Sequence, residues 1–390
     1  MKERGNTLSG AAFLMAASAT GPGFLTQSAY FTERYGPDFS AMIILSVLLS
    51  LVAQLNIWSV IVVSNKRGQD IADEVLHGFG HFIALLIFLG GIAFNIGNIA
   101  GTGMGLNVLF GIDVRAGAMI SALLCILVFA VKEFGKTMDI LAKLLGCLMI
   151  CLCLIVAILA RPPLKEVMIR TFMPERFEFM PLTTLVGGTV GGYVTFSGAH
   201  RLLDGGIKDM DGLKDARKTS IVGIAITMVV RYLVFFVCLG TVAKGIALDP
   251  ENPAATPFFE FGGYALFGVV LWVASITPVV GCSYTSVSFI RSYFRSVDRR
   301  FPVFVMLFIS LCAALFVLFG RPVELLVLAG AINGLILPFT LLAALLACRN
   351  RRIVGEYNHP AWLFALGLIV LAFSVYAGIR SFGGIMDVWR

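Results

Sequence analysis

Charged side chains are scarce in this sequence. Only 14% of the 390 residues are Asp, Glu, Lys or Arg, whereas about 25% is usual for a soluble domain. Hydrophobic residues make up 58% of the chain, and its mean hydropathy is +0.90. A folded chain cannot keep this much apolar surface from water without a bilayer. The composition therefore excludes a soluble enzyme, a nucleic-acid-binding domain and a disordered scaffold.

Several functional motifs are also missing. None of the eight cysteines forms a C-x-x-C pair, so there is neither a disulfide framework nor a zinc pattern. No apolar segment carries a nucleophile with a base, and no phosphate-binding loop is visible. No cleavable signal peptide is visible either. We therefore expect no enzyme activity, no cofactor and no nucleic-acid partner.

The apolar residues are gathered into long segments. A membrane-spanning helix needs about 20 apolar residues, and the loops between the segments are short. The sequence predicts one all-α polytopic membrane domain over residues 1–390, with the bilayer as its partner. Its eleven expected transmembrane helices lie near 8–32, 39–64, 80–111, 114–132, 138–160, 180–203, 219–244, 259–291, 302–320, 323–348 and 360–382.

Loop charges predict the orientation. If the N-terminus is cytoplasmic, the loops on that side hold 19 of the 30 Lys and Arg residues, and the opposite side holds 10. Cytoplasmic loops carry an excess of these residues in membrane proteins. We therefore expect a cytoplasmic N-terminus, an outside C-terminus and a bacterial plasma membrane. The net charge of +7 follows from the same bias.

Two of the expected helices are interrupted at corresponding places. The first contains Ala19-Thr20-Gly21-Pro22-Gly23-Phe24, and the sixth contains Gly187-Gly188-Thr189-Val190-Gly191-Gly192-Tyr193. Each opens a run of five spans, which predicts inverted repeats over about 8–160 and about 180–348, followed by an extra helix at about 360–382. Broken helices at equivalent positions mark the central site of a transporter. The alternative is ordinary glycine packing where helices cross.

With these motifs, the sequence resembles the Nramp (natural resistance-associated macrophage protein) family of divalent-metal transporters. The resemblance rests on both interruptions, on the Gly-Thr-Gly-Met-Gly-Leu-Asn-Val-Leu-Phe-Gly run at 101–111, and on Leu337-Pro338-Phe339. It implies the LeuT-like fold of inverted five-helix repeats with broken helices 1 and 6. It also implies secondary transport of a metal ion by symport.

The metal ligands of that family are absent here. Its Asp-Pro-Gly-Asn motif falls on Gly21-Pro22-Gly23-Phe24, its methionine on Gly191, its Pro-His on Gly192-Tyr193, and its glutamine on Ile336. An Asp and a Glu associated with proton movement fall on Asn95 and Asn98. A dehydrated divalent cation needs carboxylate, thioether or imidazole ligands. Holding the ion without a counter-charge in an apolar site is very unfavourable.

The remaining residues favour a small organic solute. The glycines open volume and expose backbone amides at helix ends, which suits a carboxylate or an amino-acid-like molecule. We expect coupling to a proton or sodium gradient, with coupling or gating roles for His200 and for Arg231, which could pair with a substrate anion or with Glu324. The expected substrate-binding residues are Thr20, Gly21, Gly23, Phe24, Gln27, Asn95, Asn98, Thr189, Gly191, Gly192 and Tyr193.

Two other functions stay open. A divalent metal cation of the manganese, iron or magnesium type could bind backbone oxygens while keeping part of its water. A non-transporting receptor or scaffold is the less favoured alternative. The spacing-four row Gly97, Gly101 and Gly105 predicts close helix packing, and His77 and His81 are expected to be interfacial side chains.

Overall fold

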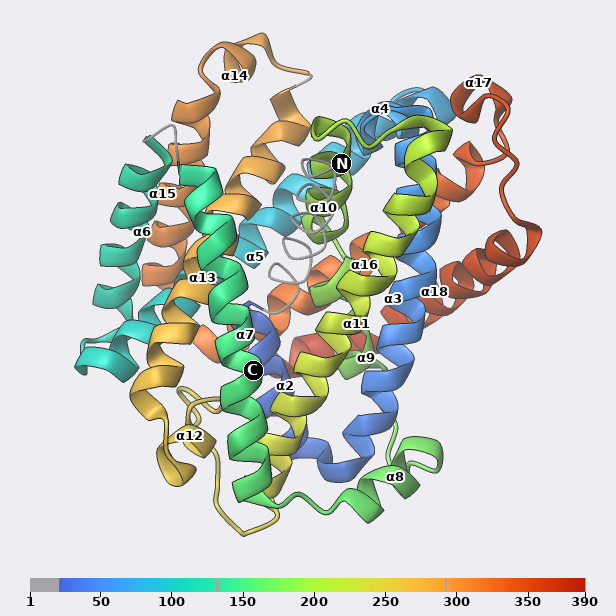
Figure 1. Cartoon of the computed structure of the whole chain (residues 1–390). Helices are drawn as coiled ribbons and strands as arrows, with labels where there is room; N and C mark the ends of the chain where they lie inside the picture. Colours follow the sequence, from blue (N-terminus) through green and yellow to red (C-terminus); the bar gives the residue numbers. More distant parts are fainter. Residues whose placement is uncertain (1–20, 131–133, 292, 390) are drawn as a thin grey trace.

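A computed structural model describes residues 21–130, 134–291 and 293–389 of the chain. Every regular element in these ranges is a helix, which confirms the all-α prediction. The first half of the chain (Figure 1) holds α2 (Pro22–Tyr35), the short η1 (Gly36–Asp38), α3 (Phe39–Ser64), α4 (Gly68–Val75), α5 (Phe79–Phe110), α6 (Val114–Ala130), α7 (Phe134–Ala160), α8 (Leu164–Phe172) and α9 (Phe179–Val190).

The second half continues the bundle without an intervening domain. It holds α10 (Tyr193–Asp204), α11 (Asp209–Val242), α12 (Thr256–Phe261), α13 (Tyr264–Arg291), α14 (Arg295–Arg299), α15 (Phe301–Phe319), α16 (Pro322–Ala347), α17 (Arg351–Val354) and α18 (Ala361–Trp389). The predicted repeat boundaries are not tested by these elements alone.

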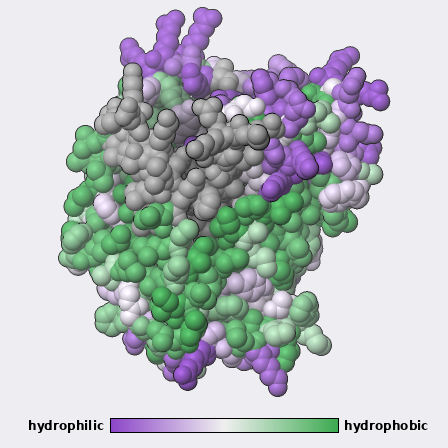
Figure 2. All heavy atoms as spheres, in the orientation of Figure 1, coloured by the Kyte–Doolittle hydropathy of each residue, from purple (hydrophilic) through white to green (hydrophobic). Residues whose placement is uncertain are grey.

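The surface is that of a membrane protein. Figure 2 shows a broad hydrophobic band across the middle of the molecule and hydrophilic residues at its two ends. Seven helical segments of the described chain are long and apolar enough to cross a membrane, or up to eight if the bent pair α7–α8 is one span. Helices α9 and α10 have only 12 residues each, too few to cross alone. The count of eleven spans therefore stays a prediction.

The two ends of the molecule carry different short helices. Helices α4, α14 and α17 lie at one end, here named the α4 end, and α8 and α12 lie at the opposite, α8 end (Figure 1). The charged residues 209–218, predicted as a loop, instead form the first turns of α11. The expected loop 161–179 contains α8. In α11, the charged turns can extend beyond the apolar band into water. In α8, a short charged helix can lie along the edge of that band.

Helix α5 is the close-packed centre of the bundle, with α6, α13 and α16 along it. A β-carbon at Gly97 would stand 2.8 Å from Leu326, one at Gly101 would stand 2.1 Å from Pro22, and one at Gly105 would stand 2.7 Å from Trp272. At such distances a neighbouring atom must move, most easily the end of the Leu326 side chain and least easily the Trp272 backbone. The predicted packing role of this glycine row is confirmed, and the row brings α5 directly against the first residue of α2.

Candidate functional site

The break between α9 and α10 consists of two glycines. Gly191 is extended, with φ −78° and ψ 156°, and Gly192 has φ +54° and ψ −133°. A positive φ favours glycine because a β-carbon would meet the backbone. A β-carbon at Gly192 would also stand 1.7 Å from Asn333 Oδ1, and one at Gly191 would stand 2.4 Å from the Asn333 carbonyl oxygen. The space expected to accommodate a solute is thus filled here by α16.

The first predicted interruption lies at the edge of the described residues: Thr20 is outside them, and the structure describes this position only from Gly21 onward, where α2 starts. Gly21 is extended, and Pro22 is the first residue of the helix. No side chain caps this N-terminus. Proline suits the first helical position because its missing N–H has no helical partner there. The contact with Gly101 holds Pro22 against α5.

Arg231 connects the two breaks. Its side chain is 0% exposed, and its Nη2 donates to Thr189 Oγ1 at 3.0 Å, in the last turn of α9. Its guanidinium lies 4.8 Å from the centre of the Phe24 ring, in the first turn of α2. A guanidinium stays protonated in proteins. The structure therefore places a permanent positive charge beside both helix breaks.

The other contacts of Arg231 are neutral. Nη1 donates to Ser46 Oγ at 3.1 Å, and Nη2 also lies 3.5 Å from the Leu185 carbonyl oxygen. Among the described residues, Nε has no hydrogen-bond partner. In the described ranges no carboxylate lies within ion-pair distance of this guanidinium, so the possible pairing with Glu324 is not made. A buried charge without a counter-ion is costly, and such a group in a membrane span points to function.

Gln27 occupies the space between α2, α9 and α16. Its Nε2 donates to the Leu326 carbonyl oxygen at 2.8 Å, whereas its Oε1 has no partner in the part of the chain that the structure describes. A β-carbon at Gly188 would stand 3.2 Å from that oxygen, and one at Gly330 would stand 2.5 Å from Nε2. The glycines of α9 and α16 thus make room for a buried amide that keeps a free acceptor.

A second group of polar atoms lies where α5, α10 and α13 meet. Asn95 Nδ2 donates to Ser283 Oγ at 2.9 Å, an interhelical hydrogen bond. The Tyr193 hydroxyl lies beside the amide of Asn98 and the thiol of Cys282, and Phe94 packs edge-on to its ring at 5.3 Å. Both Asn98 amide atoms and the Tyr193 hydroxyl lack a well-formed hydrogen bond. This group therefore offers buried donors and acceptors close to the break at 191–192.

His200 is separate from these groups. It lies seven residues beyond Tyr193 on α10, which is about 10 Å at 1.5 Å per residue. Its Nε2 accepts from the Gly68 backbone N–H at 3.4 Å, and its ring stacks on Phe289 at 5.5 Å. An ion pair, 3.5 Å long, joins Arg67, the residue before α4, to Asp204 at the end of α10. The gating role predicted for His200 fits a contact between α4 and α10, not the breaks themselves.

Metal ligands do not gather in the part of the chain that the structure describes. No group of three or more His, Cys, Asp or Glu side chains could hold an ion there. His77 and His81 are both exposed, and the His81 ring lies 3.9 Å from that of Tyr293. Sequence reasoning missed Ser46, Ser283 and Asn333 as partners of the expected site residues. Their only signal was a polar side chain inside an apolar run.

Comparisons with known proteins give one consistent result. The family model described as "Natural resistance-associated macrophage protein-like" matches residues 12–382. The uncharacterized membrane protein YcsG of Bacillus subtilis is 48% identical over 377 residues, covering 96% of this chain and 93% of its own. The divalent metal cation transporter MntH of Brucella suis is 24% identical over 416 residues, covering 95% of this chain and 89% of its own.

A solved structure shares the fold. A mutant of the manganese transporter of Eremococcus coleocola superposes with a TM-score of 0.76. The match covers 98% of this chain and 87% of that one, at 17% sequence identity.

Proposed function

Because this chain belongs to the Nramp family and is a membrane transporter with the LeuT-like fold, not an enzyme, we propose the nature of its cargo. The protein is a secondary transporter that works by alternating access. Its cargo is a small organic anion, either a carboxylate or an amino-acid-like solute. Transport is coupled to a proton or sodium gradient across the plasma membrane of a bacterium. The anion binds between the two helix breaks, within reach of Arg231.

The buried charge of Arg231 carries this proposal. It contacts both breaks, and the groups around it are hydroxyls, a carbonyl oxygen and an aromatic ring. At an assumed separation of about 6 Å and an effective dielectric constant of about 20, a divalent cation would be repelled by roughly 5 kcal/mol. An anion would be attracted instead and would supply the missing counter-charge. The unpartnered Arg231 Nε offers a further donor.

The second candidate cargo is a divalent metal cation such as manganese, iron or magnesium. The comparisons favour it over an organic solute, because relatives that are 21–24% identical are named divalent metal or metal transporters. Two relatives at 45–48% identity are named only as uncharacterized membrane proteins. In this chain the ion would depend on neutral oxygens, such as Gln27 Oε1 and Asn98 Oδ1, and on its remaining water.

Binding and uptake measurements on purified protein distinguish the two proposed cargoes. Thermal unfolding is screened against small carboxylates, amino acids, Mn²⁺, Fe²⁺ and Mg²⁺, and the ligands that stabilise the protein are then tested for uptake into proteoliposomes. We expect stabilisation by a carboxylate, lost in Arg231→Gln and partly kept in Arg231→Lys. Arg217→Gln is the matched control, because Arg217 lies on the same helix and donates to a serine, Ser59, and to Tyr357.

Two results would overturn the anion assignment. Micromolar Mn²⁺ binding that improves in Arg231→Gln would establish the metal cargo, since removing a positive charge favours a cation. Ligand binding without any substrate-dependent uptake would instead indicate a receptor.

A further inference from the structure

Helix α8 crosses the α8 end of the molecule. It bends 107° from the second half of α7 at a break of three residues, so it turns away from the direction of the bundle (Figure 1). It is too short, at nine residues, to cross a membrane. Crossing the membrane therefore cannot account for the orientation and the composition of α8.

The side chains of α8 divide into three sides. Val167 is buried and Thr171 half-buried, and this side faces the protein. Leu164, Met168 and Phe172 are spaced by four and are 55%, 70% and 84% exposed, so they share one face of the helix. Glu166 and Arg170 lie on the remaining side, and the exposed Lys165 and Ile169 lie between Phe172 and Glu166. An apolar row beside a charged row on a helix that lies flat is typical of helices at a membrane interface.

The apolar row continues a lipid-facing surface. On the preceding helix α7, Leu154, Ile155, Ile158 and Leu159 are 48–67% exposed. These residues belong to the hydrophobic belt of a membrane protein. Helix α7 ends at Ala160, and α8 begins after a break of only three residues. The exposed row of α8 therefore extends that belt around the end of the molecule.

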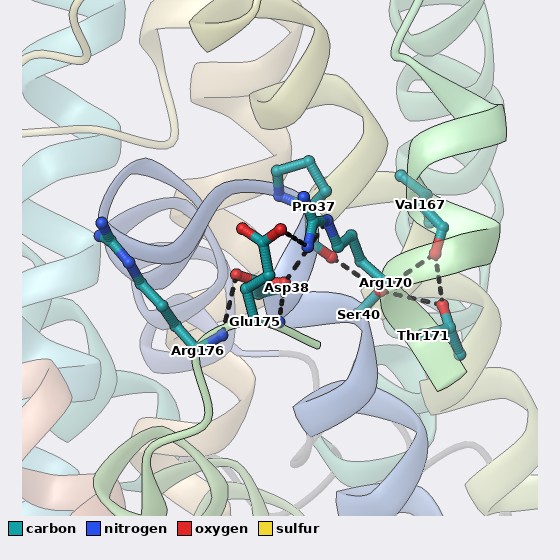
Figure 3. A network of polar contacts seen from close by, with 8 residues as sticks. All are labelled: Pro37, Asp38, Ser40, Val167, Arg170, Thr171, Glu175 and Arg176. Atoms are coloured by element: carbon teal, nitrogen blue, oxygen red, sulfur yellow. Dashed lines mark hydrogen bonds and ion pairs between the residues drawn. The ribbon is translucent and has the colours of Figure 1, made fainter. Parts of the chain in front are cut away.

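A polar network holds α8 and the following residues to the corner between α2 and α3 (Figure 3). The two Asp38 carboxylate oxygens accept from the backbone N–H groups of Glu175 and Arg176 at 3.0 and 3.2 Å. Arg170 Nε lies 3.9 Å from Asp38. A second contact joins α8 to α3, where Thr171 Oγ1 lies 2.9 Å from Ser40 Oγ. Helix α8 is thus attached to the corner next to the half-helix that begins at the first break.

We propose that α8 is an interfacial helix whose partner is the bilayer leaflet at the α8 end. Leu164, Met168 and Phe172 insert at the boundary between headgroups and acyl chains, and Glu166 stays in water. Through Asp38, the helix ties the α2–α3 corner to that leaflet. The chemistry required of the partner is an apolar surface below a polar one, which a lipid leaflet provides.

Spin labels on the full-length protein in liposomes test this arrangement. Phe172→Cys, Met168→Cys and Glu166→Cys are each labelled with a nitroxide in a parent in which the exposed Cys147 and Cys151 are replaced by alanine. Relaxation by oxygen, which concentrates in lipid, is compared with relaxation by a water-soluble nickel chelate. We expect the ratio of oxygen to nickel accessibility to be several-fold higher at 168 and 172 than at 166.

The parent without an introduced cysteine, treated with the same nitroxide reagent, measures any signal from the buried cysteines that remain. The same three labels in detergent show whether each variant is folded, by size-exclusion behaviour. Equal accessibility of all three positions to the nickel chelate in liposomes would overturn the proposal. It would mean that the apolar row faces water in the isolated protein and awaits a protein partner. This outcome leaves the cargo proposal untouched, because no cargo is used.

Discussion

The two helix breaks are built by different means. At the first, predicted break the structure describes one side only: Gly21 has a backbone conformation open to any residue, and Pro22 at the start of α2 is crowded by Gly101 of α5. Between α9 and α10, the interruption depends on the positive φ of Gly192 and on Asn333 of α16. The first break is therefore limited by packing alone, and the second by backbone conformation and packing together. Arg231 contacts both, so the two breaks share one charge.

The largest effect is expected at the second break. Gly192→Ala adds a β-carbon at 1.7 Å from Asn333 Oδ1 and forces a positive φ on alanine, which together cost roughly 3 kcal/mol of unfolding free energy. Asn333 cannot easily move, since its Nδ2 donates to the Gly90 and Ala329 carbonyl oxygens. Thermal unfolding in detergent measures the loss.

The double variant Gly192→Ala with Asn333→Ala separates the two causes. Gly192→Ala creates the clash with Asn333 Oδ1, and Asn333→Ala removes that oxygen. The loss in the double variant should therefore be smaller than the sum of the two single losses. Simple additivity would show that Asn333 does not determine the break.

A smaller effect is expected at the first break. Gly101→Ala places a β-carbon 2.1 Å from Pro22 and 2.8 Å from Ser275 Oγ. Overpacking costs roughly 1–3 kcal/mol, and alanine returns up to about 1 kcal/mol through its helix propensity. Gly281→Ala on α13 is the matched control, because its β-carbon would meet nothing within 4 Å. A loss at Gly101 equal to that at Gly192 would mean that the two breaks are constrained alike.

The shared charge gives a third, weaker test. Phe24→Leu removes the aromatic face 4.8 Å from Arg231, and a buried contact of this type is worth about 1 kcal/mol. Phe24→Tyr keeps the ring and serves as the control. The loss on Phe24→Leu, followed by thermal unfolding, should largely disappear in an Arg231→Gln background. If it persists there unchanged, Phe24 acts by packing alone.

The last test is a pH dependence away from both breaks, and its effect at neutral pH is small. Burial, and then the nearby Arg217, lower the pKa of His359 to about 4 from an ordinary value near 6.5. Between these values the unfolded chain binds a proton that the folded chain does not. Stability is therefore expected to fall as the pH is lowered from about 6.5 to 4.

His359→Gln should remove this part of the slope, measured by thermal unfolding at several pH values. Gly192→Ala and Gly101→Ala should keep it, since His359 bonds to Tyr357 and Asn56, each at 3.0 Å. A slope that disappears in the glycine variants would place the titrating group at a break.

Much of this arrangement is predictable from local sequence. The glycine row of α5, the interruption at 191–192 and the importance of a lone arginine in an apolar run each have a signal at their own positions. Asn333 has none that points to Gly192, because the contact depends on how two distant helices cross. Helix α8 was predicted as a loop since its charged residues obscure a short apolar row. The start of α11 was misplaced for the same reason.

The buried guanidinium also has an electrical consequence. The energy of one elementary charge changes by about 2.3 kcal/mol for each 100 mV that it crosses. In the proposed alternating-access cycle, an empty transporter that changes its access around Arg231 would move this positive charge through part of the membrane field, and the voltage would then bias the direction the site faces. With a monovalent anion bound, the pair is neutral and the same movement is insensitive to voltage. The membrane potential would therefore act on the return of the empty protein, and it would set how often the site is offered to each side.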